Sequence, residues 1–372
     1  MTCCCGEHAE RGGSGVGGAW LNPLVRAILF DEFQGPVTVR EVPDVTAPDG
    51  GVVVRVHATG LCLSDWHAWA GHDTDIPALP HVPGHELAGT VAQVGAGVTR
   101  WREGDRVTVP FVSGCGTCEW CRTGQAQVCP DQTQPGFTHW GSYAELVVLN
   151  AADANLVAIP EGVSYEAAAS LGCRFATAYR AVAGRAQVQA GEWVVVVGAG
   201  GVGLSAVMIA VARGARVVAV DRSEGALEAA RRAGAERTVL ADGLDVPAVV
   251  HQLTDGGAHV AVDAVGSEQT CADAVLSLRR RGRHVQVGLF APVDGGPRVP
   301  MGRVIAWELD VLGSHGMAAV DYPEMLDLVA SGALRPQDLL DRVVGMAEAA
   351  RLIPTMDTAP RAGMVVLDPA RE

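Results

Sequence analysis

The stretch WVVVVGAGGVGLSAVMIAVA at residues 193–212 constrains the fold more than any other, because twenty consecutive positions carry no charge. A run of this length could span a bilayer. Its glycine cluster, however, separates a β-branched run from a run rich in Ala, Leu and Met. A buried strand, a turn and a buried helix explain this order better than a membrane helix does. The sequence therefore predicts a strand–turn–helix unit and no membrane-spanning segment.

Strand and helix patterns divide the rest of the chain into two kinds of region. The 372 residues exceed what one hydrophobic core usually serves, so two domains are expected. Short β-rich runs before about residue 150 predict an antiparallel β domain. From about residue 176, strands alternate with amphipathic helices, as in a parallel sheet covered on both faces. The predicted α/β chain has a flexible tail at 1–24, a β-rich domain at 25–175, a doubly wound domain at 176–313 and a return at 314–372.

The net charge and the N-terminal residues indicate which classes of partner and which cellular compartment to expect. The formal net charge of −14 argues against nucleic acid or an anionic membrane, because phosphate groups need a basic face. The first twenty residues contain charges and glycines and lack an apolar stretch, which predicts a flexible tail and no secretion signal. The adjacent Cys3, Cys4 and Cys5 are expected to form an oxidation-prone tip. We expect a cytoplasmic protein, where thiols stay reduced.

The glycine cluster matches a dinucleotide-binding motif. GAGGVG at 198–203 fits G-x-G-x-x-G, follows a predicted strand and opens a predicted helix. Glycine lets the backbone approach a pyrophosphate, and the helix N-terminus supplies N–H groups and the positive end of a dipole. The predicted coenzyme contacts in this loop are Gly198, Gly200, Gly201, Val202 and Gly203.

Asp221 indicates which dinucleotide binds. It ends the next predicted strand, eighteen residues after Gly203. Its carboxylate can accept both ribose hydroxyls but would repel a 2′-phosphate, so the pattern favours NAD over NADP. Arg222 follows directly and could soften that repulsion. We therefore expect NAD as the cofactor, with Asp221 and Arg222 near its ribose.

Four cysteines lie within one short loop, CGTCEWCRTGQAQVC, with the spacing C-x2-C-x2-C-x7-C. Disulfides between cysteines three residues apart would be strained, and the cytosol would reduce them. An iron–sulfur ferredoxin run has a shorter gap before its last cysteine. A closed tetrahedral zinc site with four thiolates fits the spacing. The expected ligands of this structural zinc are Cys115, Cys118, Cys121 and Cys129.

A catalytic metal would need protein ligands from elsewhere in the chain. The candidates are Cys62 after a strand-like run, His85 in the segment VPGHE, and Cys173 in SLGCRFATAYRA. A lone buried cysteine is more often a small hydrophobic residue of the core. Because these positions are far apart in the sequence, spacing alone does not bring them together.

The motifs taken together resemble those of one enzyme family. GLCLSDWH, GHELAGTVAQVGAGV, GDRVTVPF, the four-cysteine loop, LGC-x-x-x-TAY and GAGGVG occur in the same order in zinc-dependent medium-chain alcohol dehydrogenases. The resemblance covers residues 25–372. It implies a GroES-like β-rich catalytic domain that the C-terminal return completes, and a Rossmann coenzyme domain inserted between the two. It also implies a homodimer or homotetramer.

The resemblance gives the metal candidates their roles. It implies that Cys62, His85 and Cys173 bind a catalytic zinc, with water or substrate in the fourth place, so that the chain holds two zinc ions. It places Glu86 just behind this zinc, and it implies that Asp65 orients His85.

Other residues acquire roles in proton transfer and in binding. Ser64 and His67 match the proton relay of the family, through which the substrate proton would pass to solvent. Residues that the resemblance places near the nicotinamide are Thr177, Val287, Gly288 and Leu289. Residues that it places in the substrate pocket are Phe111 and Trp140.

These assignments predict an NAD-dependent alcohol dehydrogenase (EC 1.1.1.-) that interconverts a small-molecule alcohol with its aldehyde or ketone. Zinc would lower the pKa of the bound hydroxyl, so that an alkoxide forms and releases hydride to NAD. One alternative is a biosynthetic reductase of a C=C or C=N bond, against which the presence of Ser64 and His67 argues. The other is a non-catalytic zinc-stabilised binding protein, against which the complete set of catalytic ligands argues.

Two positions depart from the family pattern. Leu63 and Met364 stand where many members place a cationic residue that contacts the coenzyme pyrophosphate. The coenzyme is therefore expected to be held less tightly than is usual in the family. Arg222 and Arg361 are the alternative sources of that positive charge.

Overall fold

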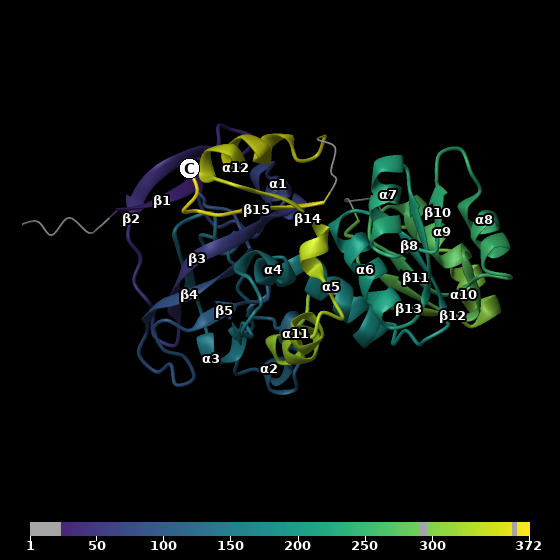
Figure 1. Ribbon diagram of the computed structural model, residues 1–372, viewed down its shortest axis with the longest axis horizontal. Coiled ribbons are helices and arrows are strands. Elements are labelled where there is room, and N and C mark those ends of the chain that lie inside the picture. The colour runs from purple at the N-terminus through teal and green to yellow at the C-terminus, as the bar shows by residue number, and fades with distance from the viewer. Residues whose placement is uncertain (1–23, 291–295, 359–362) are drawn as a thin grey trace, which may run out of the picture.

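The computed structural model describes residues 24–290, 296–358 and 363–372. The predicted tail up to residue 23, with its three cysteines, lies outside the described residues, as does Arg361. The chain forms two lobes, one built around the β-rich region and one around the parallel sheet, with α5 and α6 at their junction (Figure 1).

The second lobe contains a six-stranded sheet in the order β10-β9-β8-β11-β12-β13, and every neighbouring pair is parallel. In chain order this is 3-2-1-4-5-6, the strand order of the doubly wound dinucleotide-binding fold. The predicted doubly wound architecture is confirmed. The strands are β8 Trp193–Val197, β9 Arg216–Asp221, β10 Arg237–Leu240, β11 Ala258–Asp263, β12 Leu278–Gln286 and β13 Asp310–Gly313.

The central strand β8 shows why this sheet is covered on both faces. Its five residues are all buried. Val194 and Val196 pack into one core with α6 and α7, whereas Val195 and Val197 pack into a second core with α8 and α9. Successive side chains of a strand alternate between faces, so a continuous apolar run requires helices on both sides. The helices are α6 Gly201–Ala212, α7 Glu224–Arg232, α8 Val246–Leu253, α9 Glu268–Leu276 and α10 Met301–Trp307.

The uncharged stretch at 193–212 is therefore the predicted strand, turn and helix, formed by β8 and α6. Within the parts of the chain that the structure describes, no helix combines the length and the apolarity needed to cross a bilayer.

The first lobe contains a seven-stranded sheet in the order β14-β15-β3-β4-β5-β7, with β6 paired to β3, and a separate hairpin of β1 and β2. The last strand, β15, pairs antiparallel with β3, so the C-terminal segment completes this sheet. The strands are β1 Leu24–Leu29, β2 Thr38–Pro43, β3 Val52–Leu61, β4 Glu86–Val94, β5 Arg106–Thr108, β6 Leu146–Leu149, β7 Val157–Ala158, β14 Leu340–Val344 and β15 Met364–Leu367.

One feature of this sheet differs from the expectation of an antiparallel domain. Strand β14, which the sequence patterns did not indicate, pairs parallel with β15. The helix α12 between them returns the chain to the same end of the sheet, as a parallel pair requires.

Short helical segments carry the chain between the two lobes. Residues Leu171–Phe175 and Arg180–Arg185 form π-helical turns on either side of α5. Turns of this kind are rare in proteins, and those that occur are often found at functional sites. The remaining α-helices are α1 Leu63–Trp69, α2 Glu119–Arg122, α3 Ala152–Asn155, α4 Tyr165–Ala169, α5 Ala176–Tyr179, α11 Tyr322–Ala330 and α12 Met346–Leu352.

Candidate metal centres and coenzyme site

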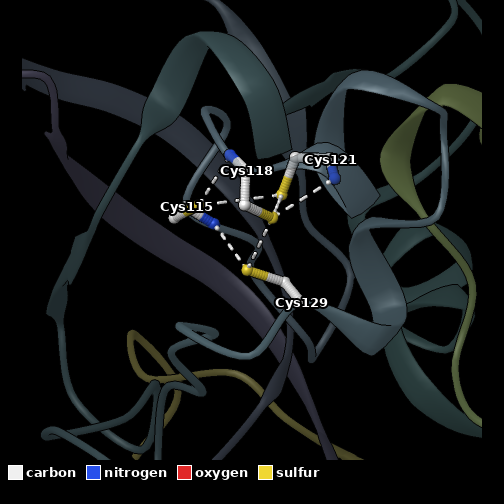
Figure 2. A group of neighbouring side chains, drawn as sticks. All are labelled: Cys115, Cys118, Cys121 and Cys129. Atoms are coloured by element: carbon white, nitrogen blue, oxygen red, sulfur yellow. Dashed lines mark hydrogen bonds between the residues drawn. The ribbon is translucent and has the colours of Figure 1, made fainter.

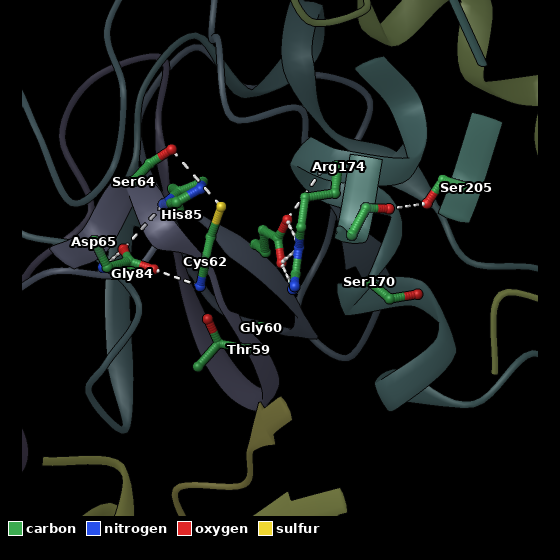
Figure 3. Close-up of polar contacts among 12 residues, drawn as sticks. Thr59, Gly60, Cys62, Ser64, Asp65, Gly84, His85, Ser170, Arg174 and Ser205 are labelled. Carbon is green, nitrogen blue, oxygen red and sulfur yellow. Dashed lines mark hydrogen bonds and ion pairs between the residues drawn. The ribbon is translucent and has the colours of Figure 1, made fainter. Parts of the chain in front are cut away.

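The buried carboxylate of Asp65 organises the first site (Figure 3). Asp65 lies in the first turn of α1, where its Oδ2 accepts hydrogen bonds from the backbone N–H of Cys62 at 2.9 Å and from the hydroxyl of Tyr143 at 2.6 Å. Its Oδ1 accepts from the backbone N–H of Gly84 and from Nδ1 of His85, both at 3.0 Å. One side chain therefore fixes the end of β3, the start of α1 and the segment that carries His85.

The second ring nitrogen of His85 is left for a metal. Because a carboxylate only accepts hydrogen bonds, Nδ1 carries the proton and Nε2 presents its lone pair. That Nε2 is buried and has no hydrogen-bond partner among the residues that the structure describes. Potential ligand atoms of Cys62, His85, Glu86 and Cys173 all lie within 4.8 Å of one another. Two sulfurs and an oriented imidazole form a donor set that suits zinc, so the residues fit the metal that the sequence predicted.

The charges of these groups agree with a cation site. The hydrogen bond with Cys173 and the nearby groups of His85 and Arg174 lower the pKa of the buried Cys62 thiol well below its usual value. Burial acts to lower the pKa of His85, but the Asp65 carboxylate and the Cys62 sulfur outweigh it and raise that pKa. The lowered pKa of Cys62 favours its thiolate, which is the form in which cysteine binds a metal.

Glu86 lies beside these ligands but is already paired. It is fully buried and accepts hydrogen bonds from the backbone N–H, Nε and Nη2 of Arg174. Burial raises the pKa of Glu86, and the positive charge of Arg174 opposes that rise. Sequence reasoning missed Arg174, although a lone charge within the otherwise apolar run LGCRFATAY is a visible signal.

The two relay candidates lie on one helix. Ser64 and His67 are three residues apart in α1, so they share a face. The Oγ of Ser64 lies 3.7 Å from Sγ of Cys62 in a hydrogen bond. The Nδ1 atom of His67 lies 3.0 Å from Nδ1 of His72, an exposed contact in which one ring donates to the other. His72 was not anticipated from the sequence.

The structure separates the two predicted pocket residues. Phe111 packs edge-on against His85, with ring centroids 6.1 Å apart, and against His315, at 5.4 Å. His315, which the sequence analysis did not identify, follows β13, and burial lowers its pKa. Trp140 lies outside these ring contacts: its Nε1 donates to the carbonyl of Pro80, and its indole borders a cavity of about 440 Å³ with residues of β1 and β6.

The four loop cysteines converge in space (Figure 2). Their sulfurs lie within 4.8 Å of one another, with separations of 3.6 Å for two pairs and 3.9 Å for a third. These separations are far too long for disulfide bonds. Four thiolates at Zn–S bonds of about 2.3 Å around a tetrahedral ion would stand about 3.8 Å apart. The loop therefore has the dimensions of a closed zinc site.

The glycine-rich turn between β8 and α6 forms the predicted cradle. Gly198 has φ +92°, a conformation that side-chain-bearing residues rarely adopt. A Cβ at Gly203 would overlap the carbonyl oxygen of Gly198, so only glycine lets α6 start this close to β8. A Cβ at Gly200 would meet open space, which leaves the helix N-terminus accessible. Val202 and Gly201 complete the first turn of α6.

Asp221 lies at the C-terminal end of β9, beside this turn. Its Oδ2 accepts from the backbone N–H of Ala199 at 2.7 Å, and its Oδ1 accepts from the backbone N–H of Ser223 at 2.8 Å. Arg222 is exposed. The carboxylate is therefore fixed at the edge of the turn, where a ribose next to a bound diphosphate would lie.

The residues expected near the nicotinamide come from separate elements. Thr177 is buried in α5, whereas Val287, Gly288 and Leu289 follow β12. Gly288 packs against the backbone of Val265 and Gly266 after β11, and Leu289 is 81% exposed. Strands β8 and β11 adjoin where the strand order reverses, which is where doubly wound sheets bind ligands.

Comparison with known proteins agrees with these sites. Residues 48–161 match the family model described as alcohol dehydrogenase GroES-like domain, and residues 201–331 match the model described as zinc-binding dehydrogenase. An alcohol dehydrogenase of Geobacillus stearothermophilus is 36% identical over 312 residues, which is 84% of this chain and 90% of that protein.

Solved structures give the same result. A crystal structure of AibC has a TM-score of 0.84 at 32% identity and covers 98% of this chain and 100% of its own. A structure titled NAD-dependent alcohol dehydrogenase has a TM-score of 0.83 at 32% identity, covering 92% of this chain and 99% of its own. The predicted GroES-like and Rossmann architecture is thereby confirmed, and the chain belongs to the zinc-dependent medium-chain alcohol dehydrogenase family.

Proposed function

We propose that this chain interconverts an alcohol with its aldehyde or ketone, using zinc and NAD as cofactors. The observation that carries the proposal is the buried, unpartnered Nε2 of His85, which lies beside the sulfurs of Cys62 and Cys173. Three such donors leave one position of a tetrahedral metal open to substrate, whereas the four-cysteine loop leaves none. The first site is therefore assigned to catalysis and the second to structure.

Zinc, when bound, supplies a Lewis acid that polarises the substrate oxygen, and NAD supplies the hydride acceptor. Cys62, His85 and Cys173 bind the metal, and Asp65 keeps the His85 ring in the tautomer that presents Nε2. Ser64 accepts the proton of the substrate hydroxyl as it gives up its own hydroxyl proton, which passes on to His67. His67 receives that proton, and its contact with the exposed His72 gives it a route to solvent.

NAD would bind at the C-terminal ends of the parallel strands. The N-terminus of α6 binds its diphosphate, and Asp221 binds the adenosine ribose, which favours NAD over NADP. Val287, Gly288 and Leu289 after β12 face the nicotinamide together with Thr177. Phe111 and His315 line the side of the pocket next to His85. The assignment of Trp140 to the pocket rests on the family resemblance alone, because the cavity that Trp140 borders is lined by residues of β1 and β6.

Two further properties are proposed. A second copy of the chain would cover the edge of the parallel sheet at β13, because Val311 there is 44% exposed and Ile305 in the neighbouring α10 is 74% exposed. This supports a homodimer or a tetramer built from it. The compartment we propose is the cytoplasm, where the thiols of both metal sites stay reduced.

The function is tested by assaying a panel of primary and secondary alcohols for NADH formation by absorbance at alkaline pH. We expect turnover with at least one class of alcohol and its loss on removal of zinc by a chelator. Turnover only with C=C or C=N substrates would favour the reductase alternative. Tight zinc binding without any turnover would favour a binding protein.

The two metal sites should respond differently to loss of one sulfur ligand. Cys118→Ser should remove one zinc equivalent and lower the melting temperature, because the loop has no core of its own, while folded protein still turns over. Cys62→Ser should abolish turnover and leave the melting temperature nearly unchanged. Metal analysis and thermal unfolding of both variants check this. An inactive but fully stable Cys118→Ser protein would contradict the structural assignment.

Asp221 should determine the choice of coenzyme. Asp221→Ser removes the ribose acceptor and the charge that repels a 2′-phosphate, and it leaves Arg222 to attract one. We expect kcat/KM to fall for NAD and to rise for NADP, measured with one alcohol at saturation. A wild-type enzyme that already prefers NADP would show that the carboxylate does not act in this way.

A further inference from the structure

Arg174 lies near Cys62 and His85 (Figure 3), and it also contacts Gly201 in the glycine-rich turn between β8 and α6. It directly follows Cys173 and is only 9% exposed. Its Nε donates to Oε1 of Glu86 at 2.9 Å, and its Nη2 donates to Oε2 of the same carboxylate. The edge of the planar guanidinium that carries Nε and Nη2 is therefore hydrogen-bonded to the Glu86 carboxylate.

The other side of Arg174 rests on the first residue of α6. A Cβ at Gly201 would lie 2.6 Å from Cδ and 3.3 Å from Nη1 of Arg174. On the opposite side, a Cβ at Gly60 would lie 2.9 Å from Nη2. The guanidinium is thus confined between the end of β3 and the N-terminus of α6, and both contacts are possible only because these positions are glycine.

One nitrogen of this buried group has no assigned partner. Nη1 forms no hydrogen bond with any residue in the described parts of the chain, whereas Nε and Nη2 do. Geometry directs Nη1 away from the Glu86 edge of the plane, on the side that contacts Gly201. Nη1 is not one of the fully enclosed polar atoms without a partner in the described parts of the chain, so it reaches a space that a ligand can enter. A ligand oxygen that accepts from it would form a charge-assisted hydrogen bond.

The place that Nη1 faces suits a diphosphate. Helix α6 is twelve residues long, and its first-turn N–H groups and dipole favour anions. The adjacent Gly200 borders open space. The family's usual cationic positions are filled here by Leu63 at the start of α1 and by Met364, which is buried in β15.

We propose that Nη1 of Arg174 donates a charge-assisted hydrogen bond to the diphosphate of the coenzyme. The same guanidinium then holds Glu86 behind the catalytic metal and the diphosphate at α6, and it supplies the charge that Leu63 and Met364 do not. This inference rests on the proposed NAD-linked function, and it replaces the expectation of a weakly held coenzyme.

The test compares two variants that both carry glutamine in place of Glu86. Glu86→Gln keeps Arg174 but removes its carboxylate partner, and the double variant Glu86→Gln/Arg174→Gln also removes the cation without leaving Glu86 buried and unpaired. Calorimetry on zinc-loaded protein gives the dissociation constants of ADP-ribose, which contains the diphosphate, and of adenosine, which does not. We expect ADP-ribose to bind at least about tenfold more weakly to the double variant, with adenosine binding unchanged.

Equal ADP-ribose affinity in the two variants would overturn the inference. A loss of adenosine affinity as large as the loss of ADP-ribose affinity would also overturn it, because it would indicate a general structural effect. If either variant fails to fold, Arg174→Lys decides the matter. It keeps the charge near Glu86 but has no second nitrogen beside Gly201, so a several-fold loss for ADP-ribose is expected and an unchanged affinity would contradict the inference. Wild-type protein that binds no ADP-ribose and oxidises no alcohol would instead refute the proposed function itself.

Discussion

The four hydrogen bonds accepted by the carboxylate of Asp65 are the interaction on which the rest of the catalytic site depends. A buried carboxylate is costly unless donors surround it, and here two backbone N–H groups, an imidazole and a phenol do so. Each donor belongs to a segment that carries part of the site: Cys62 at the end of β3, the loop before His85, and Tyr143. These hydrogen bonds therefore fix the ligand-bearing segments of the β-rich lobe in one position relative to each other.

The two metal centres differ in how the chain encloses them. The four-cysteine loop supplies all its donors from within residues 115–129, so a metal bound there links positions that are already close in the chain. The catalytic donors come from three distant segments that only the fold brings together. A fourth candidate donor, Glu86, is held by Arg174, which keeps its carboxylate occupied, as the proposed open position for substrate requires. Closure in one site and an open position in the other follow from these arrangements.

Local patterns predicted much of this molecule. The strand, turn and helix at 193–212 could be predicted because a strand and a helix that are buried on all sides have a continuous apolar sequence. The cysteine spacing indicated a closed tetrahedral site, since its ligands are close in the chain. The completion of the β-rich domain by the C-terminal segment and the meeting of Cys62, His85 and Cys173 were predicted through the family resemblance, since sequence spacing alone does not bring distant residues together.

What the sequence did not predict depends on long-range contacts. Arg174 and Glu86 are 88 residues apart, and nothing local to either indicates the pair. Tyr143 reaches Asp65 across 78 residues, and His315 packs against Phe111 from the segment that follows β13. Strand β14 carries exposed charges at Asp341 and Arg342 and is specified chiefly by its pairing with β15. The assignment of Trp140 to the pocket stays a prediction.

The most direct test of this account is the zinc affinity of Asp65→Asn, measured by competition with a chelator while the four-cysteine zinc serves as an internal reference. An amide cannot accept from all four donors, so the His85 ring loses the partner that fixes its tautomer. We expect about 10- to 100-fold weaker binding of one zinc ion only, with Asp31→Asn, a change at an exposed carboxylate, as the matched control. Unchanged affinity of both zinc ions in a folded Asp65→Asn protein would contradict the central role assigned to this carboxylate.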